Sequence, residues 1–222
     1  MMQPIDPERL QQIIPIMTTE HFTLQTGRGN TIAEANGRVT IFMSTVSSTL
    51  IALAFIGQIS RLGSAFHVFS MVLLPSLVCL GVFTFDRVMQ SGIEDAVYTR
   101  GINRVRHFYV EVAPEIGPYF VLSTYDDSTG TMLAMGIVSS TAQRIAQSFL
   151  SAAGMVAVVN SIIAGVFAGL ALGTPFSTPL SVSTIVGVSV FVLTVTLHEV
   201  YHRRLWAGIA PQRGRAVSHS LC

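Results

Sequence analysis

Three long runs without a charged side chain dominate the pattern of this chain. They cover 22 residues between Arg38 and Arg61, 24 between Arg61 and Asp86, and 54 between Arg144 and Glu199. About 20 apolar helical residues are needed to cross the hydrocarbon core of a bilayer. Each of the first two runs therefore predicts one membrane-spanning helix, and the third is long enough for two.

The third run must fold back on itself. At about 1.5 Å per residue, a single helix over it would be roughly 80 Å long, whereas the hydrocarbon core is about 30 Å thick. Gly173, Pro175 and Pro179 mark the turn. The pattern thus predicts an all-α integral membrane protein with four transmembrane helices in two hairpins. The expected spans are residues 39–58, 64–85, 149–173 and 180–198.

Helical signals continue outside the expected spans. Between Val88 and Tyr109 apolar residues recur every three to five positions, which predicts that the second span continues as an amphipathic helix until Pro114 ends it. Residues 31–38 are also compatible with a helix leading into the first span. We therefore expect a helical cytoplasmic extension below the two hairpins.

A further helix is expected after the Asp126-Asp127 turn. Ser128 or Thr129 is its expected N-cap, and we expect it to run without a break into the third span. The predicted organisation is a cytoplasmic N-terminal segment with a juxtamembrane helix (1–38), transmembrane hairpin 1 (39–85), a cytoplasmic helical segment (86–148), transmembrane hairpin 2 (149–198) and a cytoplasmic tail (199–222).

Charged residues are scarce, and their positions predict the orientation. They make up 11% of the chain, against about 25% in soluble domains, and the net charge of +1 excludes a global field that attracts nucleic acid. All 13 basic residues are arginines, and only Arg61 lies on the side of the two short turns. The positive-inside rule then predicts a bacterial inner-membrane protein with both termini in the cytoplasm.

Small residues predict close helix packing in the third span. Gly165, Gly169 and Gly173 recur every four residues, and small residues allow helix backbones to approach each other in lipid. The stripe favours a helix–helix contact, within one chain or between copies of it. The alternative is that glycine is simply common in membrane helices.

Polar side chains within the spans form a second pattern. Ser44 and Ser48 belong to a hydroxyl stripe on the first span, together with Thr40 and Ser47. Such hydroxyls bond to their own helix or to a neighbouring one, or they line a wet path. Asn160 in the third span is expected to face the interior of the bundle, because its amide needs partners in lipid.

Arginines cluster on the expected cytoplasmic helix. Arg100, Arg104 and Arg106 lie within about two turns, next to His107. They could bind an anionic ligand, lipid headgroups or a cytoplasmic protein partner. Local ion pairing is the alternative, since acidic residues surround them. Those acidic residues are Glu94, Asp95, Glu111 and Glu115.

One sequence motif suggests catalysis. His198-Glu199-Val200-Tyr201-His202 matches the HExxH pattern of zinc metalloproteases, in which two histidines one turn apart bind zinc and the Glu acts as general base. A third ligand is needed, and His219 is the sole downstream candidate. Upstream candidates are His107, Asp126 and Asp127. An interfacial helix end is the simpler interpretation, so we predict no enzyme and no cofactor.

Four segments carry a resemblance to a known family. Residues 20–26 (EHFTLQT), 34–38 (EANGR), 91–95 (SGIED) and 104–106 (RVR) resemble uncharacterised four-span membrane proteins common in actinobacteria. The resemblance extends over about half of the chain and implies no known activity. The layout alone is similar to that of small membrane effectors of bacterial conflict systems, which are thought to perturb membranes when a nucleotide signal arrives.

The sequence therefore predicts a self-associating inner-membrane protein that acts as a channel-like or signal-responsive component, surrounded by lipid. The glycine stripe, the hydroxyl stripe and the cytoplasmic helices support this hypothesis. The alternative is a non-catalytic scaffold that recruits a partner through the surface from Arg100 to Arg106. A remote alternative is a zinc-dependent membrane protease that uses His198, Glu199 and His202.

Overall fold

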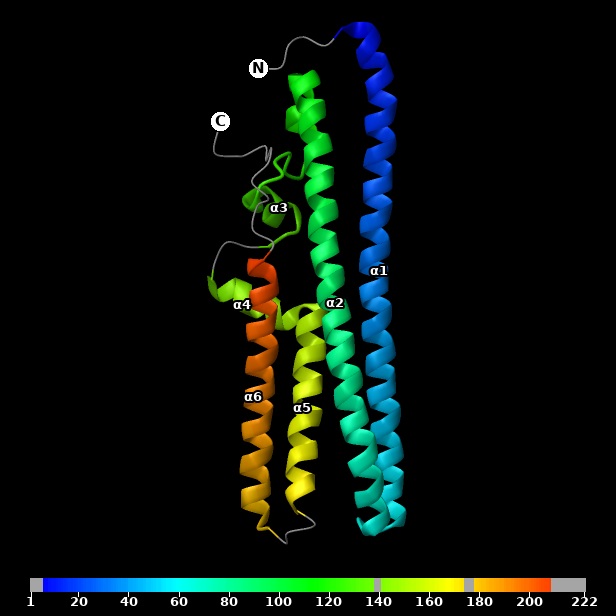
Figure 1. Cartoon of the computed structure of the whole chain (residues 1–222), viewed down its shortest axis with the longest axis vertical. Coiled ribbons are helices and arrows are strands. Elements are labelled where there is room, and N and C mark those ends of the chain that lie inside the picture. The colour runs from blue at the N-terminus through cyan, green and yellow to red at the C-terminus, as the bar shows by residue number, and fades with distance from the viewer. Residues whose placement is uncertain (1–5, 138–140, 174–177, 209–222) are drawn as a thin grey trace. The chain divides into compact units, whose positions relative to one another are not determined.

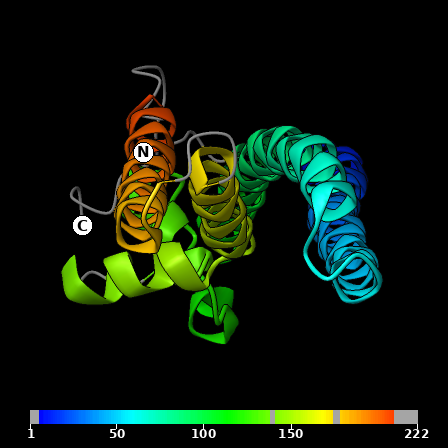
Figure 2. The same cartoon turned by 90° about the horizontal axis from the view of Figure 1, so that it is seen from below.

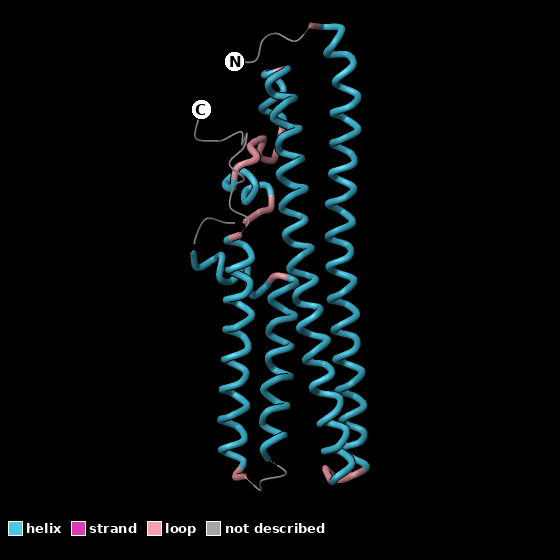
Figure 3. Tube along the Cα trace, in the orientation of Figure 1, coloured by secondary structure: helices cyan, strands magenta, loops and turns pink. Residues whose placement is uncertain are grey.

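The computed structural model describes residues 6–137, 141–173 and 178–208, and every regular element in those ranges is a helix (Figure 3). Four helices, α1, α2, α5 and α6, are long and apolar enough to cross a membrane. The prediction of an all-α fold with four such helices is confirmed. In chain order the helices are α1 (Pro7–Ile59), α2 (Ser64–Val112), the 3-10 helix η1 (Pro114–Tyr119), α3 (Ser128–Ala134), α4 (Thr141–Leu150), α5 (Ala152–Gly173) and α6 (Leu180–Ala207).

Helices α1 and α2 are much longer than a bilayer requires. They have 53 and 49 residues, against the about 20 that cross the hydrocarbon core. α2 ends at Val112, just before Pro114, so the predicted extension of the second span is confirmed. α1 begins at Pro7, earlier than expected, because its first half packs against α2: Leu24 lies directly over Gly101.

The start of α3 differs from the sequence prediction. Its N-cap is Asp127, not Ser128 or Thr129: the Asp127 carboxylate accepts a hydrogen bond from the Gly130 backbone N–H at 2.6 Å. A side chain at Gly130 would collide with the Tyr125 carbonyl. The tight turn before α3 therefore depends on both an acidic cap and a glycine.

The predicted single helix from Ser128 or Thr129 into the third span is also wrong, because α3, α4 and α5 are separate helices and α3 already ends at Ala134. The Ser151 hydroxyl accepts a hydrogen bond from the Gly154 backbone N–H at 3.0 Å, which is the geometry of an N-cap. The same hydroxyl donates to the Ser148 carbonyl at 2.7 Å. Ser151 therefore ends one helix and begins the next, so the third membrane helix starts at Ala152.

The chain divides into two compact units. Unit 1 comprises residues 1–33, 91–144 and 209–222, and unit 2 comprises residues 34–90 and 145–208. Helices α1 and α2 contribute residues to both units, whereas α5 and α6 belong to unit 2. Each unit has its own packing, and the two are described separately below.

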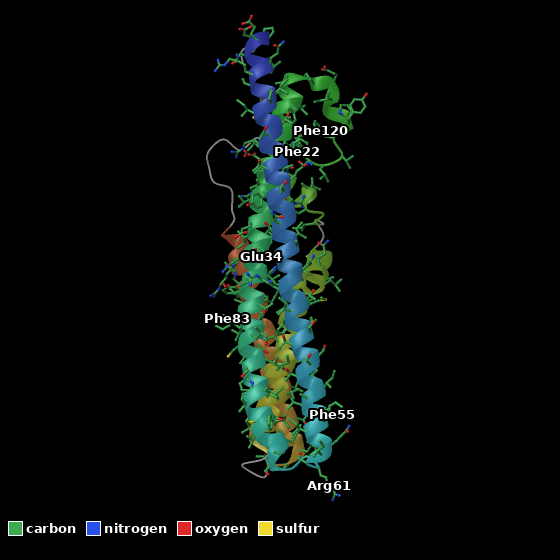
Figure 4. The ribbon with its side chains drawn as sticks, turned by 90° about the vertical axis from the view of Figure 1, so that its right-hand side faces the viewer. Phe22, Glu34, Phe55, Arg61, Phe83 and Phe120 are labelled. Atoms are coloured by element: carbon green, nitrogen blue, oxygen red, sulfur yellow. The ribbon has the colours of Figure 1, made fainter. Side chains whose placement is uncertain are left out.

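The core of unit 2 consists of aliphatic and aromatic side chains from three helices. On α1, Val39, Phe42, Val46 and Leu53 are buried and share one face. Phe83 on α2 instead extends away from this core (Figure 4). The buried contributions of α2 and α5 to the core are Leu74, Leu77, Phe85, Val88, Met89, Ala153, Val156, Ala157 and Ile163.

Unit 1 has a smaller apolar core and is held together by polar contacts. Its buried apolar side chains include Ile102 and Val105 of α2 and Ala134 of α3. Asn103, which is fully buried, donates hydrogen bonds to the Tyr125 carbonyl at 2.9 Å and to the Gly130 carbonyl at 3.3 Å. This one side chain fixes the loop before α3 against α2.

Candidate functional site

The hydroxyl stripe on α1 faces away from the core of unit 2. Thr40, Ser44, Ser47 and Ser48 are all exposed, whereas the buried face of the same helix carries Phe42 and its apolar neighbours. We call these four residues the serine face. Apolar helix faces are the ordinary lipid contact, so an exposed hydroxyl stripe in an expected span is a candidate surface for a polar neighbour.

Three members of the serine face do not bond back to their own helix, unlike most of the threonines and serines of the spans. Thr40 donates to the Asn36 carbonyl at 2.9 Å, and Thr45 and Ser161 likewise bond four residues back along their helices. Within the described part of the chain, the side-chain hydroxyls of Ser44, Ser47 and Ser48 make no hydrogen bond. A hydroxyl without a partner is costly away from water, so these three serines mark a surface suited to contact with water or with another polar face.

Asn160 lies in a different place from the serines. It is 2% exposed, and its side-chain oxygen packs onto α2 at Gly81, where an added Cβ would collide with it. That oxygen has no hydrogen-bond partner among the described residues. Asn160 therefore faces the interior of unit 2 and belongs to the packing of α5 on α2, apart from the serine face.

The glycine stripe of α5 lies against α6, and both views show the two helices side by side (Figures 1 and 2). A Cβ at Gly165 would lie 2.7 Å from the Gly187 carbonyl, and one at Gly169 would lie 3.1 Å from the Ser183 carbonyl. A Cβ at Gly173 would lie 3.4 Å from the Ser183 hydroxyl. The three glycines thus serve the hairpin within one chain, beside an open apolar groove of about 610 Å³.

The His198–His202 motif lies on α6 and meets α4. The Ser148 hydroxyl donates to Glu199 at 2.9 Å and lies 3.4 Å from Nδ1 of His202. Arg203 donates to the other Glu199 oxygen at 2.7 Å. His198 donates from Nδ1 to the Thr194 carbonyl at 2.7 Å. Glu199 therefore works as a hydrogen-bond acceptor that joins α4 to α6.

The space beside this motif is small. The cavity between Ser148, Glu199 and His202 has a volume of about 10 Å³, which is room for about one water molecule. No group of three or more His, Cys, Asp or Glu side chains within the described ranges could hold a metal ion. The downstream candidate His219 lies outside the described residues.

The arginines of the predicted cluster have different partners and different exposure. Arg104 pairs with the buried carboxylate of Asp126 at 2.6 Å, although its own side chain is 62% exposed. Arg106 is half-buried, and its guanidinium donates to the Asn103 side-chain oxygen at 3.4 Å. Arg100 is half-buried on the same helix. Arg104 thus acts on the loop before α3 through Asp126.

Basic residues of α1, which the sequence pattern did not indicate as site residues, lie close to the segment of α2 from Asp95 to Tyr109. Arg28 pairs with Asp95 at 2.6 Å, and the positive charge of Arg28 acts on Arg106. Burial first, and then Arg28, lower the pKa of Arg106. Burial and Arg106 lower the pKa of His21, whose ring stacks on Tyr109 with centroids 6.1 Å apart. Two basic groups of α1 therefore meet a half-buried arginine of α2.

No local sequence signal predicted these contacts between helices. Arg28 and Asp95 are 67 residues apart, and Ser148 and Glu199 are 51 apart. Only the turn at Arg61 and Leu62, which makes α1 and α2 antiparallel, implied that early residues of α1 face late residues of α2. Comparisons with protein-family models, curated proteins and solved structures found no match to this chain. The resemblance stated above therefore stays a prediction.

Proposed function

We propose that this chain is a self-associating, channel-like membrane protein in which the serine faces of several copies line a water-filled path. The observation that carries the proposal is the serine face itself: four exposed hydroxyls, three of them without a partner in the described chain, on a helix that is apolar enough to cross a membrane. Water or a second serine face would satisfy these hydroxyls, whereas lipid would not. Association of several copies supplies either partner.

The proposed path needs an outer surface that suits lipid, and the other helices provide one. In α6 only 6% of the most apolar window is buried within the chain. Phe83 of α2, 71% exposed, also extends away from the core. A copy that turns α6 and Phe83 outward can therefore direct its serine face to its neighbours.

We assign the receiving role to unit 1, on the cytoplasmic side. Helices α1 and α2 contribute residues to both units. Ion pairs that join different elements, as in unit 1, suit a signal-responsive component. The orientation follows from the arginine positions and the positive-inside rule.

The first test is the water accessibility of the serine face. Ser44→Cys and Ser48→Cys are made in a background with both native cysteines replaced by Ser, and the protein is reconstituted in liposomes. A membrane-impermeant, charged thiol reagent should modify both positions at least about tenfold faster than Val192→Cys, because thiolate forms in water. Val192 is the matched control, since it lies on α6, is 54% exposed and has apolar neighbours.

The second readout is ion flux through the same liposomes. Reaction with the bulky reagent at Ser48→Cys should block most of the flux, and reaction at Val192→Cys should leave it unchanged. Crosslinking should recover more than one copy at the same protein-to-lipid ratio. Slow modification at both serine positions, or flux that is unaffected by modification there, would show that the face contacts lipid and would refute the proposal.

A further inference from the structure

A stripe of polar residues runs along α2 inside unit 1. Asp95, Thr99, Asn103 and Arg106 are spaced by four, four and three residues, so they share one face of the helix. This face is not solvated: Thr99 is 1% exposed and Asn103 is fully buried. Buried polar side chains normally have hydrogen-bond partners, so the partners of this stripe can be accounted for one by one.

Two members of the stripe are fully engaged. Asp95 accepts from Arg28 of α1 at 2.6 Å. Asn103 holds the loop before α3 through the Tyr125 and Gly130 carbonyls. These contacts hold α1, α2 and the loop together without using Thr99.

Thr99 is the exception in the stripe. Its hydroxyl oxygen is buried and has no hydrogen-bond partner anywhere in the described ranges. Leaving a buried hydroxyl unsatisfied destabilises a folded chain, because the group has lost its hydrogen bonds to water. A bound group that contacts Thr99 would remove this cost.

The charges beside Thr99 are also unbalanced. Arg106 lies two turns further along the same face, and its one hydrogen bond in the described chain goes to the neutral amide of Asn103 at 3.4 Å. The neighbouring charge that acts on it is another arginine, Arg28. Arg28 is paired with Asp95, whereas no carboxylate in the described chain lies within ion-pair distance of Arg106, which leaves the positive charge of Arg106 in excess.

We infer that Thr99, Arg106 and Arg28 form an internal binding site in unit 1 for a phosphate-type oxyanion. A guanidinium offers paired N–H donors that match two phosphate oxygens, and a threonine hydroxyl donates to a third. The bound anion would satisfy Thr99 and neutralise the excess charge. A phosphate-bearing solute and a lipid phosphate share this chemistry, and the experiment separates the two. The inference stands apart from the channel-like function and does not require it.

The test uses the full chain purified in a nonionic detergent, with inorganic phosphate and pyrophosphate as probes. Each probe should raise the melting temperature with a saturable dependence, beyond the effect of sodium chloride at equal ionic strength. Arg106→Gln should weaken binding at least about tenfold, since a charge-assisted hydrogen bond contributes about 1.5–3 kcal/mol. Arg9→Gln is the control: it removes one exposed arginine of the same unit and should leave binding unchanged.

Thr99→Val separates a binding role from a structural one and is expected to fold. It removes the unsatisfied hydroxyl and keeps the shape, so the variant without probe should be at least as stable as the original chain. Its affinity for phosphate should nevertheless fall about threefold or more. Unchanged phosphate affinity in Thr99→Val would overturn the site as defined here.

The lipid source is tested in a second arm. The chain is placed in nanodiscs of phosphatidylcholine alone or of phosphatidylcholine with phosphatidate, whose headgroup is a phosphate monoester. Stabilisation by phosphatidate that is lost in Arg106→Gln, without an effect of free phosphate, would assign the site to lipid phosphate. If neither free phosphate nor phosphatidate stabilises the chain, the inference is wrong.

Discussion

The two units satisfy their polar side chains in different ways. In unit 2, hydroxyls such as Ser76 of α2 and Thr184 and Ser189 of α6 donate to the carbonyl four residues back in their own helix. In unit 1, hydroxyls such as Thr31 do the same, but charged groups also join different elements, as in the pairs Arg28–Asp95 and Arg104–Asp126. A helix in lipid has no water to hydrogen-bond its polar groups, so these groups form hydrogen bonds within the same helix.

The difference determines what holds each unit together. In unit 2, α5 and α6 meet through glycines that allow their backbones to approach closely. Close packing is needed there because the hydrophobic effect does not drive helices together in lipid. In unit 1, ion pairs and the hydrogen bonds of the Asn103 side-chain amide specify which helix and loop are in contact. The serine face and Thr99 depart from the pattern of their own unit, which is why each carries a proposal.

The largest expected effect breaks the packing of unit 2. Gly165→Leu would force a side chain against the Gly187 carbonyl, which a Cβ at Gly165 would approach to 2.7 Å. We expect a loss of more than about 3 kcal/mol in the free energy of unfolding, because overpacking against backbone cannot relax by a rotamer change. Denaturation of the purified chain in mixed micelles measures it. Gly37→Leu is the control.

That control sharpens the comparison between glycines. A Cβ at Gly37 would meet nothing within 4 Å, so leucine there should be neutral or stabilise α1 by up to about 1 kcal/mol through helix propensity. Equal losses at both glycines would mean that the α5–α6 contact does not depend on close backbone approach.

A smaller effect is expected from the polar joint of unit 1. Asn103→Leu leaves the Tyr125 and Gly130 carbonyls without the donor that holds them, at a cost of about 2 kcal/mol. Hydrogen exchange should rise in the loop before α3 and remain unchanged in α5. Asn30→Leu, at an exposed position of the same unit, should change stability by less than about 0.5 kcal/mol. Equal effects of the two substitutions would contradict the role given to Asn103.

The smallest expected effect is a pH dependence in unit 1. Burial, and then the positive charge of Arg106, lower the pKa of His21, so the folded chain favours the neutral imidazole. The unfolded chain then binds a proton more readily, and stability should decline as the pH falls below the ordinary value for histidine, about 6.5. His21→Gln should reduce this decline in melting temperature between pH 7 and 5. An identical profile in the variant would exclude His21 as its source.

Several features of the fold followed from local sequence. The spans were predictable because charge-free length is a property of consecutive residues, and so was the extension of α2, because its apolar spacing continues past Phe85. The break at Ser151 was missed, since a serine looks ordinary until its hydroxyl is seen to cap α5. The early start of α1 was missed because it depends on contact with α2.

The candidate site residues were also predictable only in part from local sequence. Sequence spacing alone placed Gly165, Gly169 and Gly173 on one face of a helix, and Ser44 and Ser48 on one face of another, because helical periodicity is local. Only the tertiary structure decided that the glycines meet α6, that the serines face outward and that Arg104 is committed to Asp126. Which face turns inward depends on residues far away in the chain, and a periodic pattern carries no information about them.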